Sequence, residues 1–235
     1  PPLTSPVAVV ASTLTATAEC GVATPPAVDL MISNSGTADL VIRSAMVEGG
    51  FTVATALPVT VAPGAQRALS IVPPAAVIGT DRGGGTKTGT LTLVTNEIAM
   101  GERTVELTAN VLGANLAFTD EAGAAIVLAF AGTSGACPVS KTVFVRNTGT
   151  STLTLGAASA SAFAFSAYSG AFGGFSGGTL APGAFVTQEI RPVTDVACTG
   201  SGPVTYAVSG TVCSAPNAAV VGAFNITGAS SCFCS

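Results

Sequence analysis

The sequence contains no histidine and no tryptophan, and only 9% of its 235 residues are charged. Without histidine, a Ser-His-Asp or Cys-His catalytic arrangement is impossible, and the commonest protein metal ligand is missing. The eight Lys and Arg residues are spread singly through a chain of formal net charge −4, which leaves no basic surface for nucleic acid or anionic lipid. The longest apolar stretch, residues 122–131, is about half the length that crosses a bilayer. We therefore expect no enzymatic activity, no cofactor, no nucleic-acid partner and no membrane insertion.

The residues that are present indicate folded domains with a weakly charged surface. Hydrophobic residues make up 48% of the chain, and 28 residues are glycine. Disordered chains are poor in aliphatic and β-branched residues, so this composition is typical of globular domains. With so few charges, the surface must be built largely from Ala, Thr, Ser and Gly, and it offers little electrostatic repulsion between copies.

Two sequence landmarks occur twice in the chain. Residues 34–42, which read NSGTADLVI, return as residues 147–155, which read NTGTSTLTL. An Ala-Pro-Gly-Ala turn at residues 62–65 returns at residues 181–184, and each copy is followed at the same spacing by an isoleucine and a proline. Such an internal repeat indicates a duplication. We predict two domains, residues 1–113 with an N-terminal arm and residues 114–235 with a Cys-rich C-terminal tail.

Each repeat contains short segments in which apolar and polar residues alternate, and no segment with the period of a helix. In the first repeat, residues 28–32 and 40–42 flank an Asn-Ser-Gly turn, which predicts a β-hairpin. Residues 79–86 predict a flexible hairpin loop, and residues 90–94 and 104–109 predict the last hairpin. Short strands with frequent turn signals are typical of an antiparallel β-sandwich. The predicted fold is all-β, with two tandem Ig-like antiparallel β-sandwich domains.

The order of these motifs resembles a known family. A strand, N-x-G-T, L-x-I, a Phe, an APG turn, I-x-P, G-T-L-T-L and V-x-L resemble the Ig-like repeats of bacterial choice-of-anchor D surface proteins and the related abnormal-spindle/Hydin-type domains. The resemblance covers most of residues 20–112 and, more loosely, residues 137–228. It implies an extracellular or scaffolding role without enzymatic activity, and it carries over no active-site residues. The second copy departs from the family pattern because its last strands contain Cys198 and Cys213.

The cysteines are divided unevenly between the repeats, and they include no C-x-x-C pair. We expect disulfides and an oxidising compartment from the six cysteines Cys20, Cys137, Cys198, Cys213, Cys232 and Cys234. Because the first repeat holds Cys20 alone, full pairing requires at least one bridge between the repeats or between chains. We expect one cysteine of the C-terminal tail to reach Cys20 and the other to close onto Cys198 or Cys213. We hypothesise that the partner of Cys20 belongs to the next molecule.

The N-terminal sequence and the aromatic residues suggest where contacts between molecules would form. The chain begins Pro1-Pro2 without a basic or hydrophobic leader, as expected of a secreted chain whose signal peptide has been removed, and we expect an extracellular or cell-surface location. Residues 3–17 could be donated as a strand to a neighbour, and the alternative is that both termini dock on their own domains. The interface residues that we predict in this arm are Leu3, Val7 and Val9.

Five aromatic residues crowd into residues 163–175, with Gly and Ser between them: Phe163, Phe165, Tyr168, Phe172 and Phe175. One interpretation is a loop that folds back to fill the core. The other is an exposed adhesive or subunit-contact loop, because aromatic residues are enriched at interface hot spots. Both interpretations stay open at this point.

The acidic residues offer little for catalysis. Asp120 and Glu121 are the only local pair of carboxylates, and adjacent acids in a turn are usually solvated. Calcium binding by this pair is the alternative, although the spacing is unlike that of an EF-hand, and we predict no metal site. Asn225 begins the one N-glycosylation sequon, and the many Ser and Thr residues offer acceptors for O-linked glycans.

The function that we predict from the sequence is a structural subunit of an extracellular filament or surface assembly. It would be a homo-oligomer or homopolymer that associates through its termini and disulfides. The alternative is a cell-surface adhesion or ligand-binding module that uses residues 163–175.

Overall fold

The computed structural model describes residues 5–98, 100–133, 140–160, 163–170, 178–192, 199–214 and 217–227. The chain divides into two compact units, with unit 1 comprising residues 1–77 and 84–112 and unit 2 comprising residues 78–83 and 113–235. This division lies within one residue of the predicted boundary. However, the sequence did not indicate that residues 78–83 belong to the second unit. The described segments contain no helix that could span a membrane.

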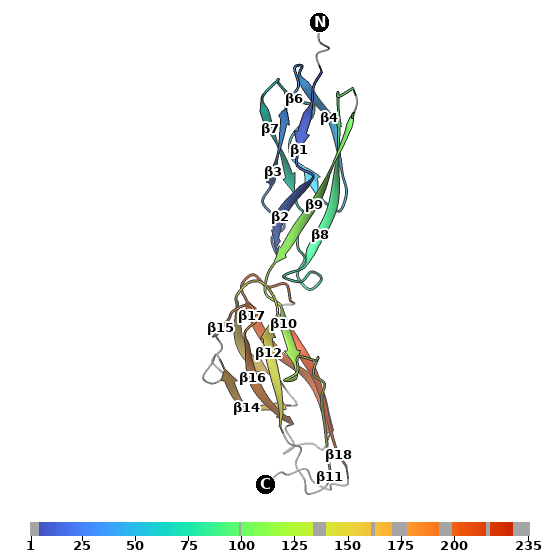
Figure 1. The fold of residues 1–235 in the computed structure, drawn as a ribbon. Helices are drawn as coiled ribbons and strands as arrows, with labels where there is room; N and C mark the ends of the chain where they lie inside the picture. The colour runs from blue at the N-terminus through green and yellow to red at the C-terminus, as the bar shows by residue number, and fades with distance from the viewer. Residues whose placement is uncertain are drawn as a thin grey trace. The chain divides into compact units, whose positions relative to one another are not determined.

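Unit 1 is a sandwich of a four-stranded sheet and a five-stranded sheet (Figure 1). The four-stranded sheet has the order β1 (Ala8–Val10), β3 (Val28–Asn34), β7 (Gln66–Val72) and β5 (Thr52–Val53). The five-stranded sheet has the order β2 (Thr13–Glu19), β9 (Glu102–Leu112), β8 (Thr86–Thr95), β4 (Leu40–Val47) and β6 (Val59–Val61). Neighbouring strands are antiparallel except β2 and β9, which are parallel.

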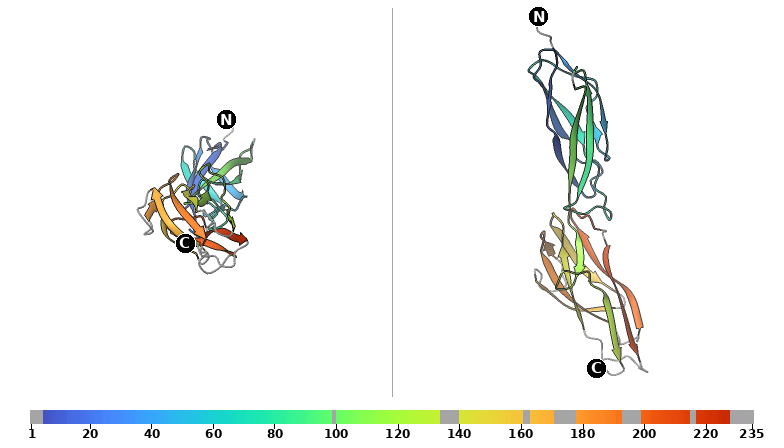
Figure 2. Two further views of the ribbon diagram at one scale, coloured as in Figure 1. Left: turned by 90° about the horizontal axis from the view of Figure 1, so that it is seen from below. Right: turned by 45° about the vertical axis from the view of Figure 1, so that its right-hand side comes forward.

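Unit 2 repeats this topology strand for strand. Its strands form a second sandwich (Figures 1 and 2). Its four-stranded sheet has the order β10 (Leu116–Thr119), β12 (Lys141–Asn147), β16 (Phe185–Pro192) and β14 (Phe163–Gly170). Its five-stranded sheet has the order β11 (Leu128–Thr133), β18 (Asn217–Thr227), β17 (Thr199–Ser209), β13 (Leu153–Ser159) and β15 (Gly178–Leu180). The prediction of two Ig-like β-sandwiches is confirmed.

Each unit has its own hydrophobic core, because apolar side chains alternate along the strands and point between the two sheets. In unit 1, Leu30 and Ile32 of β3 pack against Leu91 and Leu93 of β8 in one buried cluster. In unit 2, Val143 and Val145 of β12 lie in a cluster with Tyr206 of β17. The residues between them on the same strands face outward.

The first sequence landmark marks a buried asparagine. Asn34 is 1% exposed, and its side-chain amide donates to the carbonyl oxygens of Ala38 (2.7 Å) and Val61 (2.9 Å). Its side-chain oxygen accepts hydrogen bonds from the backbone N–H groups of Val7 (3.2 Å) and Gly36 (3.0 Å). Asn34 therefore ties the start of the chain, its own turn and β6 together.

The second landmark lies beside the first. The N–H of Asn34 donates to the carbonyl of Ala65, and the N–H of Gly64 donates to the carbonyl of Asn34, with distances of 3.1 and 2.8 Å. The Ala-Pro-Gly turn is thus hydrogen-bonded to the Asn-x-Gly turn. The two landmarks recur together because each satisfies the backbone groups of the other.

The Asn-x-Gly turn does not form the hairpin that the sequence predicts. β3 pairs with β1 and β7, whereas β4 pairs with β6 and β8 in the opposite sheet. The turn therefore carries the chain from one sheet to the other, and Asn34 supplies the bonds that a hairpin ladder would have supplied. Residues 79–86 are not a hairpin loop either, because they join β7 and β8 of different sheets. By contrast, the pairing of β8 with β9 confirms the predicted last hairpin.

The N-terminal arm is part of unit 1, so for the described part of residues 3–17 the structure supports the alternative, in which the arm docks on its own domain. β1 pairs with β3, and β2 pairs with β9 over its whole length. The N–H groups of Ser35 and Thr37 donate to the carbonyls of Val7 and Ser5, respectively. The backbone groups that strand donation needs are already bonded within the same unit.

Candidate functional surfaces

The outer face of the β10-β12-β16-β14 sheet carries an arginine between two phenylalanines. The guanidinium of Arg146 lies 5.1 Å from the ring centroid of Phe144 and 4.5 Å from that of Phe185. The two ring centroids are 5.3 Å apart, and the rings are tilted by 47°. These distances are those of cation–π and aromatic contacts. We call Phe144, Arg146 and Phe185 the aromatic–arginine patch.

The strand register builds this patch. Arg146 of β12 lies directly opposite Phe185 of β16, and Phe144 is two residues earlier on the same face of β12. Val143 and Val145, which alternate with them, are fully buried. Because side chains alternate between the faces of a sheet, the patch residues face outward. Phe185 is 42% exposed, so the patch is open at the surface.

The guanidinium of Arg146 is fixed by two hydrogen bonds. Its Nε donates to the hydroxyl of Thr119 (2.9 Å), and an Nη2 hydrogen points to the carbonyl of Glu121 (3.5 Å). In the part of the chain that the structure describes, no carboxylate lies within ion-pair distance of Arg146. Its positive charge is therefore held in place at the surface, and none of the described carboxylates neutralises it.

The patch is specific to unit 2. The two copies can be matched through their landmarks, and the unit 1 positions that correspond to Phe144, Arg146 and Phe185 are Met31, Ser33 and Gln66. Ser33 and Gln66 form the same cross-strand pair in unit 1 as Arg146 and Phe185 do in unit 2. Since the rest of the sandwich is common to both copies, this difference is not needed for the fold.

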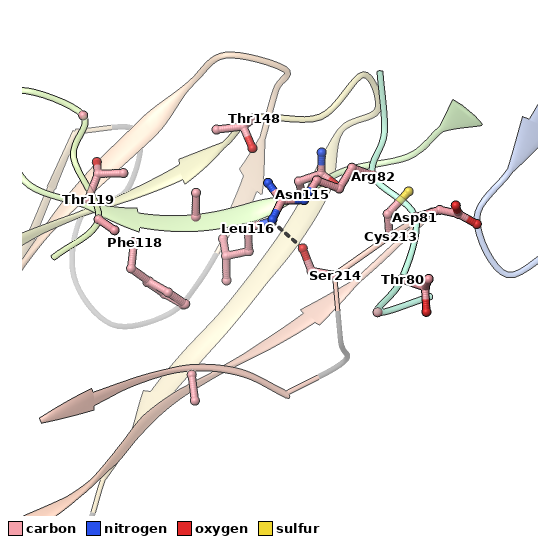
Figure 3. Close-up of a pocket in the computed structure, with 15 residues that line it drawn as sticks. Thr80, Asp81, Arg82, Asn115, Leu116, Phe118, Thr119, Thr148, Cys213 and Ser214 are labelled. Carbon is pink, nitrogen blue, oxygen red and sulfur yellow. Dashed lines mark hydrogen bonds between the residues drawn. The ribbon is translucent and has the colours of Figure 1, made fainter. Parts of the chain in front are cut away.

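A pocket of about 610 Å³ lies beside β10 in unit 2 (Figure 3). Thr119 and Phe118 of β10, the 78–83 segment and Ser214 contribute to its lining. Several of its polar groups are already used within unit 2. The Asn115 amide bonds both the N–H and the carbonyl of Gly83, and the hydroxyl of Ser214 accepts the N–H of Leu116 (2.7 Å). We therefore attribute a structural role to these bonds.

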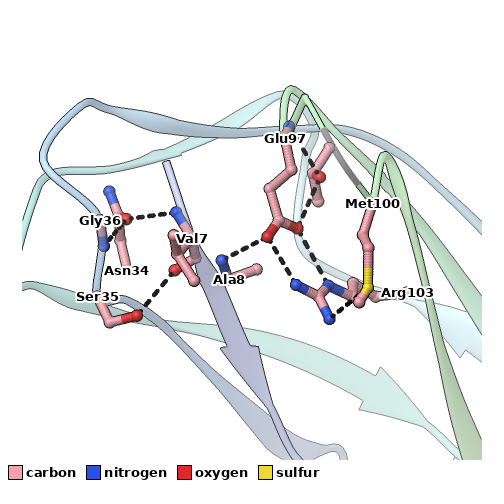
Figure 4. Close-up of polar contacts among 9 residues, drawn as sticks. Val7, Ala8, Asn34, Ser35, Gly36, Glu97, Met100 and Arg103 are labelled. Atoms are coloured by element: carbon pink, nitrogen blue, oxygen red, sulfur yellow. Dashed lines mark hydrogen bonds and ion pairs between the residues drawn. The ribbon is translucent and has the colours of Figure 1, made fainter. Parts of the chain in front are cut away.

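A buried ion pair holds β1 in unit 1 (Figure 4). Glu97 lies in the loop between β8 and β9, and its side chain is 6% exposed. Its carboxylate accepts two hydrogen bonds from Arg103, of 2.7 and 3.1 Å, and one of 2.9 Å from the backbone N–H of Ala8. Burial alone would raise the pKa of Glu97, but the bonds from Arg103, Ala8 and Thr95 together outweigh it and lower the pKa.

The predicted interface residues of the N-terminal arm are partly described. Val7 and Val9 are 40% and 52% exposed, while the backbone of this segment is bonded to its own unit. Leu3 lies outside the described residues. The two valines thus offer side chains, but not an unpaired strand, to another molecule.

The aromatic segment 163–175 is a strand over its first part, not a loop. Residues 163–170 form β14, which pairs with β16. In this register Phe163 lies opposite Pro192, Phe165 opposite Ile190 and Tyr168 opposite Gln188. The side chains of β14 are outside the described part of the structure, so both interpretations of this segment stay predictions. Phe172 and Phe175 lie outside the described residues.

The cysteine hypothesis is corrected in its central part. Cys20 and Cys213 are joined in a disulfide within one chain. The partner of Cys20 is therefore neither the C-terminal tail nor the next molecule. Cys20 is held by a hydrogen bond from its N–H to the carbonyl of Leu112, and Cys213 by one to Ala114. The other four cysteines, Cys137, Cys198, Cys232 and Cys234, lie outside the described residues. A disulfide fits an oxidising, extracellular environment.

The acidic pair has a local role. The Asp120 carboxylate accepts the N–H of Ala124 and closes the turn between β10 and β11. Among the residues that the structure describes, no group of three potential ligands is placed to hold a metal ion.

Sequence reasoning missed the aromatic–arginine patch. The signal was available, because matching the two copies position by position shows Phe, Arg and Phe where the first copy has Met, Ser and Gln. What the sequence lacked was the cross-strand register, which places Phe185 beside Arg146 although they are far apart in the chain.

No protein-family model and no curated protein matches this chain. The resemblance to choice-of-anchor D and abnormal-spindle/Hydin-type repeats therefore stays a prediction. Among solved structures, a Porphyromonas gingivalis protein of unknown function is 12% identical over 93% of this chain and 99% of its own, with a TM-score of 0.37.

Two further structures share this level of similarity. The CupB2 chaperone of Pseudomonas aeruginosa is 13% identical over 92% of this chain and 98% of its own, with a TM-score of 0.33. The extracellular cadherin domains 1–4 of protocadherin gamma B7 are 9% identical over 95% of this chain and 51% of that one, with a TM-score of 0.42. At these values the similarities carry no argument about function.

Proposed function

We propose that this chain is a non-enzymatic module of an extracellular surface structure, in which unit 2 makes the contact through its aromatic–arginine patch. Unit 1 acts as a spacer of the same fold. The observation that carries this proposal is the difference between the copies: Phe144, Arg146 and Phe185 stand where unit 1 has Met31, Ser33 and Gln66.

The chemistry of the patch supports a role in binding. Arginine and aromatic residues dominate the residues that contribute most to binding energy at protein surfaces. In the isolated sandwich, the exposed phenylalanine and the half-buried charge are only partly removed from water, so they contribute little to its stability. They contribute more to the stability of a complex in which a partner covers them. In a chain with only 9% charged residues, a fixed charge beside two rings is a distinct feature of the surface.

The test is retention of the full chain on insoluble surface material shed by the source cells. We expect Phe185→Ala and Arg146→Gln each to lower the apparent affinity at least about tenfold, which corresponds to the loss of one central contact. The matched controls are Gln66→Ala and Ser33→Ala at the equivalent positions of unit 1. Equal retention of the Phe185 and Gln66 variants would overturn the proposal.

A second candidate function is self-assembly, which the long edge strand β14 favours. β14 ends its sheet with 8 residues, none of them charged, whereas its counterpart β5 in unit 1 has 2. Soluble proteins usually keep exposed edge strands short or charged, because such edges pair with other chains. In sedimentation velocity, Ala164→Lys should abolish any association that the wild type shows, and Thr52→Lys should not. A wild-type chain that is monomeric at every concentration contradicts this candidate.

A further inference from the structure

We propose that the aromatic–arginine patch of unit 2 binds a carbohydrate that carries a single carboxylate. This inference rests on the proposed function, because it names the class of ligand for the same surface. A uronic acid and a sialic acid are the two sources of this chemistry.

The guanidinium of Arg146 has N–H donors that no acceptor among the described residues uses. Its Nε serves Thr119 and one Nη2 hydrogen serves the carbonyl of Glu121, and among the described residues no acceptor takes its Nη1 hydrogens. A guanidinium carries more N–H donors than these two acceptors use. Its planar fork matches a carboxylate, which it can bind through two parallel hydrogen bonds.

The position of this fork is fixed before any ligand arrives. The rings of Phe144 and Phe185 contact it, and Thr119, which is 7% exposed, anchors Nε at 2.9 Å. A side chain that is already ordered loses less conformational entropy when it binds. The Thr119 anchor leaves the Nη side of the fork as the part that a carboxylate can reach.

The surface around the fork suits a sugar better than a peptide. Phe185 is 42% exposed and offers an apolar surface to the C–H face of a sugar ring. The exposed Thr142 follows on the same outer face of β12, where its hydroxyl can pair with a sugar hydroxyl. β12 itself is covered on both sides by β10 and β16, so its backbone offers no edge for an added peptide strand.

The patch favours a ligand with one carboxylate, because Arg146 is its one cation. On the outer face of β16, Phe185 is followed by Thr187, which lies opposite Phe144. One guanidinium fork matches one carboxylate, and the groups beside it on these two strands are aromatic rings and hydroxyls. An oligosaccharide with a single acidic sugar can place its carboxylate on Arg146 and keep its neutral sugars elsewhere on the face.

The experiment is titration of the full chain, by isothermal calorimetry or NMR, with two acidic probes. One is a xylo-oligosaccharide with a single glucuronic acid substituent, and the other is 3′-sialyllactose. Unsubstituted xylo-oligosaccharide and lactose are the matched neutral probes, and hexaglutamate tests for recognition of charge alone. We expect one acidic sugar to bind at least about tenfold more tightly than its neutral match. The acidic sugar that binds identifies the source of the carboxylate.

The variants separate recognition from folding. Arg146→Gln and Phe185→Ala should each weaken binding of the acidic sugar at least about tenfold, and Arg146→Lys should weaken it as well, because lysine keeps the charge but loses the fork. Ser33→Ala and Gln66→Ala in unit 1 should bind as the wild type does. Thermal unfolding of each variant shows whether unit 2 is still folded.

Three results would overturn the inference: no binding of either acidic sugar at millimolar concentrations, equal binding of acidic and neutral sugars, or equally tight binding of hexaglutamate. The proposed function fails separately. If the patch variants lose retention on surface material while no sugar binds, the ligand class is wrong and the contact surface stands. If a sugar binds but the patch variants are retained normally, the surface is a sugar site and the proposed function is wrong.

Discussion

Asn34 and Asn147 occupy the same place in the two units, and their side chains make the same set of hydrogen bonds. Asn147 donates to the carbonyls of Ser151 (2.8 Å) and Leu180 (2.9 Å), as Asn34 donates to those of Ala38 and Val61. Its oxygen accepts from the N–H groups of Asn115 and Gly149, as that of Asn34 accepts from Val7 and Gly36. The first landmark of the repeat is therefore a structural requirement of the sandwich.

Replacing either asparagine should destabilise its unit strongly. Asn34→Ala or Asn147→Ala leaves buried backbone groups without partners, and each such group costs about 1–3 kcal/mol. We expect the free energy of unfolding, measured by urea denaturation, to fall by about 2–4 kcal/mol. Asn110→Ala, at an exposed position on β9, is the control and should change it by less than about 0.5 kcal/mol. Equal stability of the Asn34 and Asn110 variants would contradict this role.

The glycine two residues after each asparagine should be equally restricted, because a chain segment crosses directly over it. A Cβ on Gly36 would collide with the carbonyl oxygen of Ser5, and one on Gly149 with that of Gly113. Gly36→Ala should therefore lower the free energy of unfolding by about 1–3 kcal/mol, the usual cost of overpacking.

The control for the glycine prediction is Gly101→Ala. Its added methyl group would meet no atom closer than 3.8 Å, so it should leave the midpoint of thermal unfolding almost unchanged. If the melting temperatures of the Gly36 and Gly101 variants fall by the same amount, the close crossing of Ser5 is not what selects glycine.

The repeat and the sandwich could be predicted from the sequence because both depend on local patterns. Alternating apolar residues identified the strands, and the pairing of residues 90–94 with 104–109 follows from their adjacency in the chain. The connection through residues 34–36 was predicted wrongly because the same Asn-x-Gly turn can close a hairpin or cross between sheets. The outcome depends on Asn34 reaching Val61, a partner 27 residues away.

The candidate site escaped prediction for a related reason. Arg146 and Phe185 become neighbours only through the β12–β16 register, and neither residue belongs to a recognised motif. We predicted interface residues among the aromatic residues of segment 163–175 instead, because these residues are close together in the sequence.

The ion pair of Glu97 with Arg103 should make unit 1 sensitive to acid. The pKa of Glu97 is lowered in the folded state, from an ordinary value of 4.5, so the pair stabilises the fold above that value. This contribution is lost as the pH falls from about 4.5 through the lowered pKa, because the folded state must then take up a proton that the unfolded state already holds.

Comparison of the wild type with Glu97→Gln measures this effect. The wild type should be the more stable protein at pH 7, and the difference in unfolding free energy should shrink as the pH falls below about 4.5. The control is Glu106→Gln, at an exposed position on β9, which should leave the pH dependence of unfolding like that of the wild type. A difference between wild type and Glu97→Gln that stays constant with pH would show that the bonds to Arg103 and Ala8 do not depend on the charge.

The disulfide between Cys20 and Cys213 makes a prediction that also tests self-association through cysteine. Removing a native disulfide typically costs about 2–4 kcal/mol, because the unfolded chain gains conformational freedom. Cys20→Ala, Cys213→Ala and the double variant should lose similar amounts of unfolding free energy, since each removes the same bond. Peptide mapping of the unreduced protein should recover one peptide pair that contains both cysteines. A non-reducing gel on which the wild type forms a ladder that Cys20→Ala abolishes would show that Cys20 bonds another molecule, and would contradict the bond within one chain.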